Sequence, residues 1–185
     1  VDAVDKDGKN ALHYSFSVIG SPEITEILLS NGIDVNSADK DGKTPLMYAA
    51  ENAYYKVFDI LKQYDAEINK IDNEGKTALM YSCMTGDEYE NVLWLVENGA
   101  DVNVIDDKGK TPLIYACENC YREDGMEMVR ILADAGCDVN AVASAVQGVR
   151  SDIASVGSQL GFSSERIINA VNQGDCGVIQ ALKDC

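Results

Sequence analysis

Three Gly-Lys-Thr triplets contain the residue types that bind phosphate; they begin at Gly42, Gly75 and Gly109. In a phosphate-binding loop, backbone N–H groups and the lysine hold the anion, and a further glycine stands five residues before the triplet. The three positions where that glycine is needed hold Ser37, Lys70 and Val104. The sequence therefore does not predict a nucleotide site.

Metal-binding patterns are also incomplete. Asp39 and Asp41-Gly42 have the spacing of a calcium loop, but the position of its closing carboxylate holds Tyr48. Cys117 and Cys120 have the spacing of zinc ligands, and a structural zinc ion needs four. The two cysteines that could complete that set from elsewhere are Cys83 and Cys137. We expect no metal and no cofactor.

Residues for catalysis are not evident in the sequence. His13 is the single histidine, so a triad would have to be built around it alone. The six cysteines show no regular spacing, which indicates reduced thiols and a cytoplasmic protein. We therefore predict a protein that is not an enzyme.

The charge of the chain is strongly negative. It has 31 acidic and 15 basic side chains, a formal net charge of -16. Such a charge repels nucleic acid and anionic membranes, so neither is an expected partner. A basic protein would be attracted, although acidity of this kind also serves solubility. No apolar run reaches the length of a membrane helix.

The triplets belong to a longer phrase that occurs four times. Its glycines are Gly8, Gly42, Gly75 and Gly109, separated by 34, 33 and 34 residues. A period of this length predicts a stack of supersecondary units, because each unit buries its apolar face only against its neighbours.

The second copy indicates the elements of one unit. Thr44 and Pro45 predict a capped helix start. Apolar residues from Val57 to Leu61 predict a second helix, which ends near Asp65, where the sister units have glycine. Residues 68–72 read as an extended strand that leads into the next glycine turn.

These units resemble the ankyrin repeat, whose pattern is D-x-x-G-x-T-P-L-H-x-A, then a second helix and G-A-D-V-N. Residues 99–103 reproduce the closing G-A-D-V-N in full, and the other units keep similar pairs. Departures occur at Asp65, which replaces the glycine, and at the histidine, which is kept only as His13. The resemblance implies an all-α solenoid joined by β-hairpin-like loops, with units at 1–34, 35–67, 68–101 and 102–141.

The resemblance also implies a non-catalytic module that binds a partner protein through its concave surface. Our alternative is an acidic regulatory or inhibitory protein that blocks a basic, nucleic-acid-binding site of its partner. The concave surface is expected to consist of hairpin tips and the exposed ends of the first helices. These residues are Lys6, Asp7, Lys9, Lys40, Asp41, Lys43, Glu51, Asn52, Asn73, Glu74, Lys76, Met84, Thr85, Asp107, Lys108, Lys110, Glu118 and Asn119.

Two residue types recur once in each unit and predict rows along the stack. The lysines, either partner contacts or solvated charges, are Lys9, Lys43, Lys76 and Lys110. The tyrosines, which could contact a partner or pack between repeats, are Tyr14, Tyr48, Tyr81 and Tyr115.

The pattern changes after residue 141. Within residues 142–162, apolar residues recur at alternating intervals of four and three, which predicts an amphipathic helix, either on the end of the stack or in a coiled coil. Residues 163–185 resemble a partial, capping-type ankyrin repeat. We expect it to lie before residue 1 in space, within one molecule or by end-to-end self-association. The insertion at 120–125 predicts a surface loop.

Overall fold

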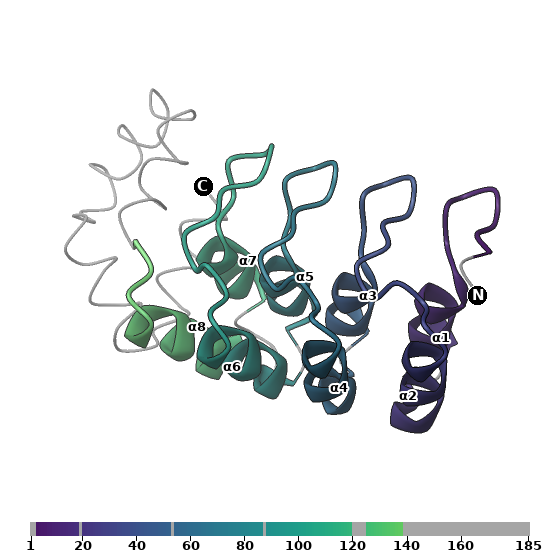
Figure 1. Cartoon of the computed structure of the whole chain (residues 1–185). Helices are drawn as coiled ribbons and strands as arrows, with labels where there is room; N and C mark the ends of the chain where they lie inside the picture. Colours follow the sequence, from purple (N-terminus) through teal and green to yellow (C-terminus); the bar gives the residue numbers. More distant parts are fainter. Residues whose placement is uncertain (1–2, 19, 53, 87, 120–124, 139–185) are drawn as a thin grey trace, which may run out of the picture.

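The computed structural model describes residues 3–18, 20–52, 54–86, 88–119 and 125–138. Over these residues the chain forms a stack of helix pairs (Figure 1). The helices are α1 (Ala11–Val18), α2 (Pro22–Ser30), α3 (Pro45–Glu51), α4 (Phe58–Gln63), α5 (Ala78–Thr85), α6 (Tyr89–Glu97), α7 (Pro112–Glu118) and α8 (Gly125–Asp134). A 3-10 turn, η1 (Tyr55–Val57), leads into α4. The predicted all-α repeat stack is confirmed.

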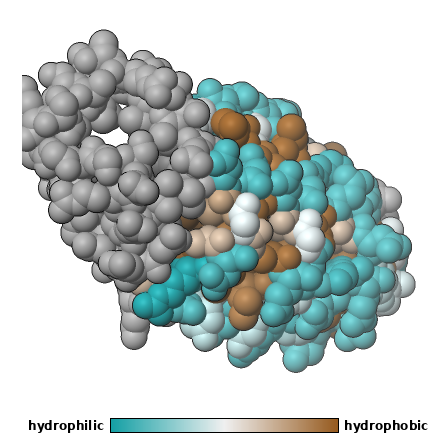
Figure 2. Space-filling view, turned by 90° about the vertical axis from the view of Figure 1, so that its left-hand side faces the viewer, coloured by the Kyte–Doolittle hydropathy of each residue, from teal (hydrophilic) through white to brown (hydrophobic). Residues whose placement is uncertain are grey.

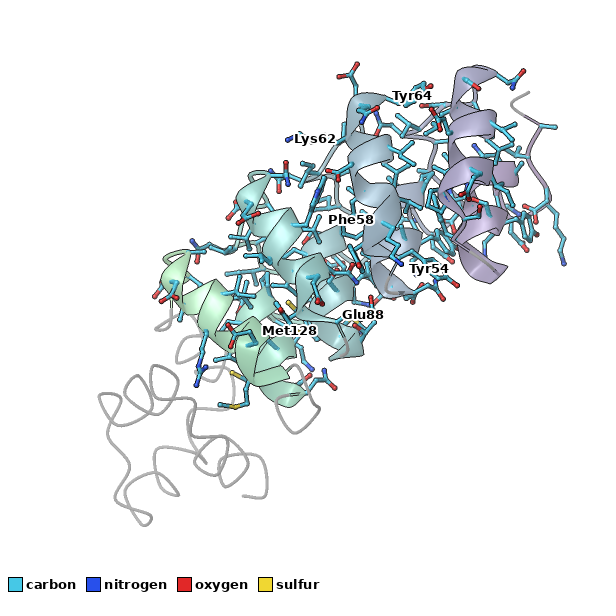
Figure 3. The ribbon with its side chains drawn as sticks, turned by 90° about the horizontal axis from the view of Figure 1, so that it is seen from below. Tyr54, Phe58, Lys62, Tyr64, Glu88 and Met128 are labelled. Carbon is cyan, nitrogen blue, oxygen red and sulfur yellow. The ribbon has the colours of Figure 1, made fainter. Side chains whose placement is uncertain are left out.

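The helices form two layers beneath a row of loops. Figure 1 shows α1, α3, α5 and α7 next to the hairpin loops, and α2, α4, α6 and α8 farther from them. Apolar side chains from both layers form the core, and one leucine per repeat is almost fully buried: Leu12, Leu46, Leu79 and Leu113. In the second layer, the rings of Phe58 and Trp94 meet edge to face at 5.2 Å between centroids. Figure 3 labels Phe58, the first residue of α4. The core therefore runs through the whole described stack.

Threonine caps begin three of the inner helices, as predicted for Thr44. The side chains of Thr44, Thr77 and Thr111 accept hydrogen bonds from backbone N–H groups three residues later, at 3.3 to 3.4 Å. Pro45 and Pro112 occupy the first helical position, where a missing N–H costs nothing. Each hairpin is thus joined to its helix by a local sequence signal.

Left-handed residues end the outer helices, as the pattern predicts. Gly32, Gly99 and Gly136 have φ between 80° and 88°. Asp65 occupies the same place in the second repeat and adopts φ 62° although it has a Cβ atom. The departure from glycine therefore changes the residue but not the backbone conformation.

The expected extended strand at residues 68–72 is wrong. Residues 67–70 form a turn, and the structure assigns no strand among the residues that it describes. The reason lies in the hairpin that follows. Only two backbone hydrogen bonds close it, from Asp72 to Lys76 and from Gly75 to Asp72. The N–H groups of Glu74 and Lys76 donate to the Asp72 side chain, and that of Asn73 donates to the carbonyl of Asp41 in the previous hairpin, so no β-ladder develops within this hairpin.

Asn36 and Asn69, which belong to a Val-Asn and an Ile-Asn pair, connect neighbouring repeats. The side-chain amide of Asn36 donates to the carbonyl of Asp65, and its oxygen accepts from the N–H of Glu67, at 2.9 and 2.8 Å. Asn69 makes the same two bonds to Gly99 and Asp101. These two asparagines therefore satisfy backbone groups of the next repeat.

Candidate functional site

An aspartate fixes each hairpin to the inner helix of its own repeat, and in the second, third and fourth repeats this aspartate is buried. In the third repeat, one carboxylate oxygen of Asp72 accepts the N–H groups of Glu74 and Lys76, at 2.8 and 2.9 Å. The other accepts the hydroxyl of Tyr81 at 2.6 Å. We call this arrangement the Asp–Tyr unit. The other three pairs are Asp5 with Tyr14, Asp39 with Tyr48, and Asp106 with Tyr115.

The Asp–Tyr unit was not anticipated from the sequence, although a signal exists. In every repeat the aspartate precedes the tyrosine by nine residues. Burial, and then the hydrogen bond to the carboxylate, raise the pKa of Tyr48, Tyr81 and Tyr115 above the ordinary tyrosine value. These hydroxyls therefore remain protonated and can donate.

Three of the four tyrosines are unavailable to a partner. Tyr48, Tyr81 and Tyr115 are only 5 to 7% exposed, whereas Tyr14 is 50% exposed. The tyrosine row could either contact a partner or pack between repeats, and the burial of these three tyrosines fits packing. Their hydroxyls donate to the hairpin aspartates. Tyr14 differs because no earlier repeat lies over it within the described residues.

Lysines cover the buried tyrosine rings and link consecutive repeats. The ammonium nitrogen of Lys43 lies 4.8 Å from the ring centre of Tyr48 and 4.1 Å from that of Tyr81. The ammonium nitrogen of Lys9, in the first repeat, lies 5.0 Å from the ring centre of Tyr48 in the second repeat. A cation at this distance from a ring face is attracted by its quadrupole. The lysine row therefore contributes to the stacking of the repeats.

The same lysines are paired with carboxylates of the stack. Lys43 binds Glu51, and Lys110 binds Glu118, both at 2.7 Å. Glu74 accepts from Lys76 at 2.7 Å and from Lys108 at 3.0 Å. Lys76 is only 7% exposed, which corrects the expectation that it faces a partner. The positive charge of the row is largely neutralised inside the molecule.

The remaining predicted contact residues lie on the hairpin tips and at the ends of the inner helices. The exposed ones are Lys6, Asp7, Lys40, Asp41, Glu51, Asn52, Asn73, Glu74, Met84, Asp107 and Lys108. The half-buried ones are Lys9, Lys43, Thr85, Lys110, Glu118 and Asn119. The side-chain amides of Asn52 and Asn119 donate to the backbone carbonyls of Tyr48 and Tyr115, respectively. Part of the hydrogen-bonding capacity of these two residues is therefore used within their own helices.

Successive hairpins are bonded to one another through the backbone. The N–H of Lys40 donates to the carbonyl of Asp7, that of Asn73 to Asp41, and that of Asp107 to Glu74, each at 2.9 Å. The hairpins thereby form a row in which each loop fixes the position of the next. Together with the Asp–Tyr units, these bonds hold the tips in one arrangement.

Among the described residues, the histidine and the cysteines have structural surroundings. The ring nitrogens of His13 lie 2.7 Å from Oδ1 of Asn10 and 3.2 Å from the carbonyl of Lys43, and burial lowers its pKa. Cys83, Cys117 and Cys137 are buried thiols. Burial raises the pKa of Cys137 to about 11.

The described residues contain no group of three or more histidine, cysteine, aspartate or glutamate residues arranged to hold a metal ion. None of their helices is long and apolar enough to cross a membrane. Cys120, Cys176 and Cys185 lie outside the described residues, as do the amphipathic helix and the partial repeat. Of the predicted surface loop at 120–125, residues 120–124 also lie outside them, whereas Gly125 is buried and begins α8.

The fold and this surface define a helical repeat protein with a preorganised row of loops. A family model described as "Ankyrin repeats (3 copies)" matches residues 1–72 and 60–143. The chain belongs to the ankyrin repeat family. It is also similar to the fibronectin type 3 and ankyrin repeat domains 1 protein of Mus musculus, with 47% identity over 53 residues. That match covers 28% of this chain and 15% of the mouse protein.

Acid should weaken the ion pairs around Glu74. Hydrogen bonds from Lys76 and then Lys108 lower the pKa of Glu74 to about 2, from an ordinary value of 4.5. A lowered carboxylate pKa stabilises the fold above the unfolded value, and this contribution disappears as pH falls through the folded value. In Glu74→Gln, thermal melting should therefore depend less on pH between 4.5 and 2 than in the wild type. Glu97→Gln, which removes an exposed carboxylate without an ion pair among the described residues, should retain the wild-type slope.

Proposed function

We propose that the hairpin tips and the exposed ends of the inner helices bind a partner protein, and that the chain acts by this binding alone. Membership of the ankyrin repeat family supports the general role, because ankyrin repeats generally mediate protein–protein interactions. The single observation that carries the proposal for this surface is its rigid construction. Each tip is fixed by an Asp–Tyr unit below and by a backbone bond to a neighbouring hairpin.

Rigid tips favour binding because a partner does not have to order them. Association is opposed by the entropy lost when loops and side chains become fixed. Here that ordering has already occurred on folding. Specificity would then come from the side chains at the outermost positions of the loops, such as Lys40, Asp41, Asn73 and Asp107, which are exposed and differ between repeats.

A charge-reversal pair tests the surface without disturbing the core. Lys40→Glu combined with Asp107→Lys changes two exposed tips and leaves the net charge unchanged. A matched control, Glu26→Lys with Lys56→Glu, makes the same exchange at exposed positions on the outer side of the stack. Partners captured by the wild type should bind the tip variant at least about tenfold more weakly, a loss of roughly 1.4 kcal/mol. Affinity measured by titration calorimetry should be unchanged in the control.

Equal affinity of the wild type and the tip variant would contradict the proposal. The salt dependence of the same titration tests our alternative, an acidic protein that blocks a basic site of its partner. The net charge of -16 favours that function. Binding dominated by this charge would weaken steeply as salt is added, because exposed charges are screened. Binding through the shaped tips would weaken much less.

A further inference from the structure

The first repeat has an uncovered side at the end of the stack. Figure 1 places α1 and α2 at this end, and no described element lies beyond them. In the other described repeats, the equivalent side is covered by the repeat before it. We call the uncovered side the open face; its residues are Ala11 and Tyr14 of α1, and Ile24 and Ile27 of α2. None of the four belongs to the proposed set of partner contacts.

Equivalent positions in the other repeats show that the open face is an interior type of surface. Ile24 is 40% exposed, whereas its counterparts are completely buried: Val57, Asn91 and Met128. The register of the outer helices is given by a leucine that accepts a backbone bond from the residue five positions later in every repeat: Leu28, Leu61, Leu95 and Leu132. Ala11 is also exposed, whereas its counterparts are buried: Pro45, Ala78 and Pro112. Tyr14 follows the same rule, so all these positions lose their cover only in the first repeat.

The contact between the first two repeats shows what normally covers such a face. The ring of His13 meets that of Tyr48 edge to face, at 5.5 Å between centroids, and Lys9 lies over the same tyrosine ring. In the outer layer, η1 packs against α2. The hairpins add a backbone bond, in which the N–H of Lys40 donates to the preceding loop. The equivalent donor of the first hairpin is the N–H of Lys6, which bonds to no described residue.

The open face also keeps the residue types of an interior contact. A terminal repeat that faces water is expected to have a polar outer side. Here the four side chains are aliphatic or aromatic, and Ile27 is 61% exposed. By contrast, Figure 2 looks at the molecule from the opposite end, where the described surface in view is largely hydrophilic with smaller apolar patches. An apolar patch of this kind indicates a surface that binds another protein unit.

The charge of the chain disfavours a second copy as the cover of the open face. The first repeat carries exposed carboxylates at Asp7, Glu23 and Glu26, and the net charge of the whole chain is -16. Two such molecules repel each other. A repeat with a lysine at the place of Lys9 fits better. In the stack, Lys9 and Lys43 each lie over the tyrosine ring of the following repeat, at 5.0 and 4.1 Å.

We propose that the open face binds one further ankyrin-type repeat, supplied by polypeptide other than residues 1–185. The inner helix of that repeat packs on α1, and its outer helix packs on α2. It presents a lysine to the ring of Tyr14 and a backbone carbonyl to the N–H of Lys6. The open face is thus a second interaction surface, beside the hairpin tips of the proposed function, and its occupant extends the stack by one unit.

Extension of the full chain by one repeat tests the proposal. A copy of residues 35–67 is fused directly before Val1, which keeps the register because Val1 aligns with Ile68. Circular dichroism should show that the added repeat is helical. Hydrogen exchange of peptides from α1 and α2 should then be at least about tenfold slower than in the wild type. The matched control carries the same copy after Cys185 and should keep the wild-type exchange rates of α1 and α2.

A pair of substitutions on the open face gives an independent measurement. Ile24→Ser with Ile27→Ser changes two side chains that are exposed in the wild type, so exchange of α1 and α2 should remain within about twofold there. In the extended protein the same pair should remove the added protection, because both side chains are then buried. Sedimentation of the wild type and of the serine pair reports whether either variant associates with itself.

Three results would overturn the proposal. Exchange of α1 and α2 could be as fast with a helical added repeat as without it. The serine pair could accelerate exchange in the unextended chain at every protein concentration, which would identify residues of this chain as the cover of the open face. The wild type could also form dimers that the serine pair abolishes, which would identify a second copy as the occupant.

Discussion

Replacement of Asp72 by alanine should lower the free energy of unfolding by about 3 kcal/mol. The carboxylate receives three hydrogen bonds, from the N–H groups of Glu74 and Lys76 and from the hydroxyl of Tyr81. Asp72 and Tyr81 are almost completely buried, so water cannot easily replace the lost acceptor. Bonds to a charged group each contribute more than neutral ones, and a buried donor left without an acceptor adds a penalty. Urea denaturation measures the change.

The first repeat contains the matched control. Asp5 makes the same three hydrogen bonds, to Asp7, Lys9 and Tyr14, but Tyr14 is half exposed. Water can therefore satisfy these donors when the carboxylate is removed. Asp5→Ala should cost about 1 kcal/mol or less. Equal losses in the two variants would show that burial does not set the strength of the Asp–Tyr unit.

Gly42→Ala should destabilise the protein by about 2 to 3 kcal/mol, from two separate causes. Gly42 has φ 80°, a conformation that disfavours any side chain. An added Cβ would also lie 2.7 Å from Oδ1 and 2.9 Å from the backbone nitrogen of Asn73. The backbone nitrogen cannot move without lengthening its bond to the carbonyl of Asp41. The variant should therefore separate two hairpins as well as strain one.

Gly109→Ala isolates the first of these causes. Gly109 has φ 73°, but no atom of the described residues lies within 4 Å of the place of its Cβ. Only the strained backbone conformation should contribute to the loss of stability, which should be about 1 kcal/mol. Thermal or urea denaturation of both variants gives the difference. If the two losses were the same, contact between the hairpins would not be important for stability.

The features that sequence reasoning identified correctly depend on neighbouring residues. Thr44 and Pro45 define a helix start within four residues, and Gly32 and Gly99 end helices by their own backbone freedom. Such local signals determine where a helix starts or ends independently of the rest of the chain. The repeat period then implied a stack of such units, although the sequence alone could not exclude a strand at residues 68–72.

The features that were missed depend on distance in space. Asp72 and Tyr81 are nine residues apart, a separation that matches neither a helix nor a strand, and only the folded hairpin brings them together. Lys76 was expected at the surface because it belongs to a hairpin of the predicted concave face. Its stem is covered in the stack while its ammonium group binds Glu74. Burial of a long side chain depends on the adjacent repeat, so one unit considered alone cannot reveal it.

The backbone bond between hairpins has a consequence for how such a chain can change during evolution. Each interface joins an N–H to a carbonyl one repeat earlier, at 2.9 Å, whatever side chains the two residues carry: lysine with aspartate, asparagine with aspartate, and aspartate with glutamate. A duplicated or deleted unit would meet the same donor and acceptor at the new junction. The array can therefore change length by whole units through recombination, while mutations alter the exposed tips independently of the scaffold.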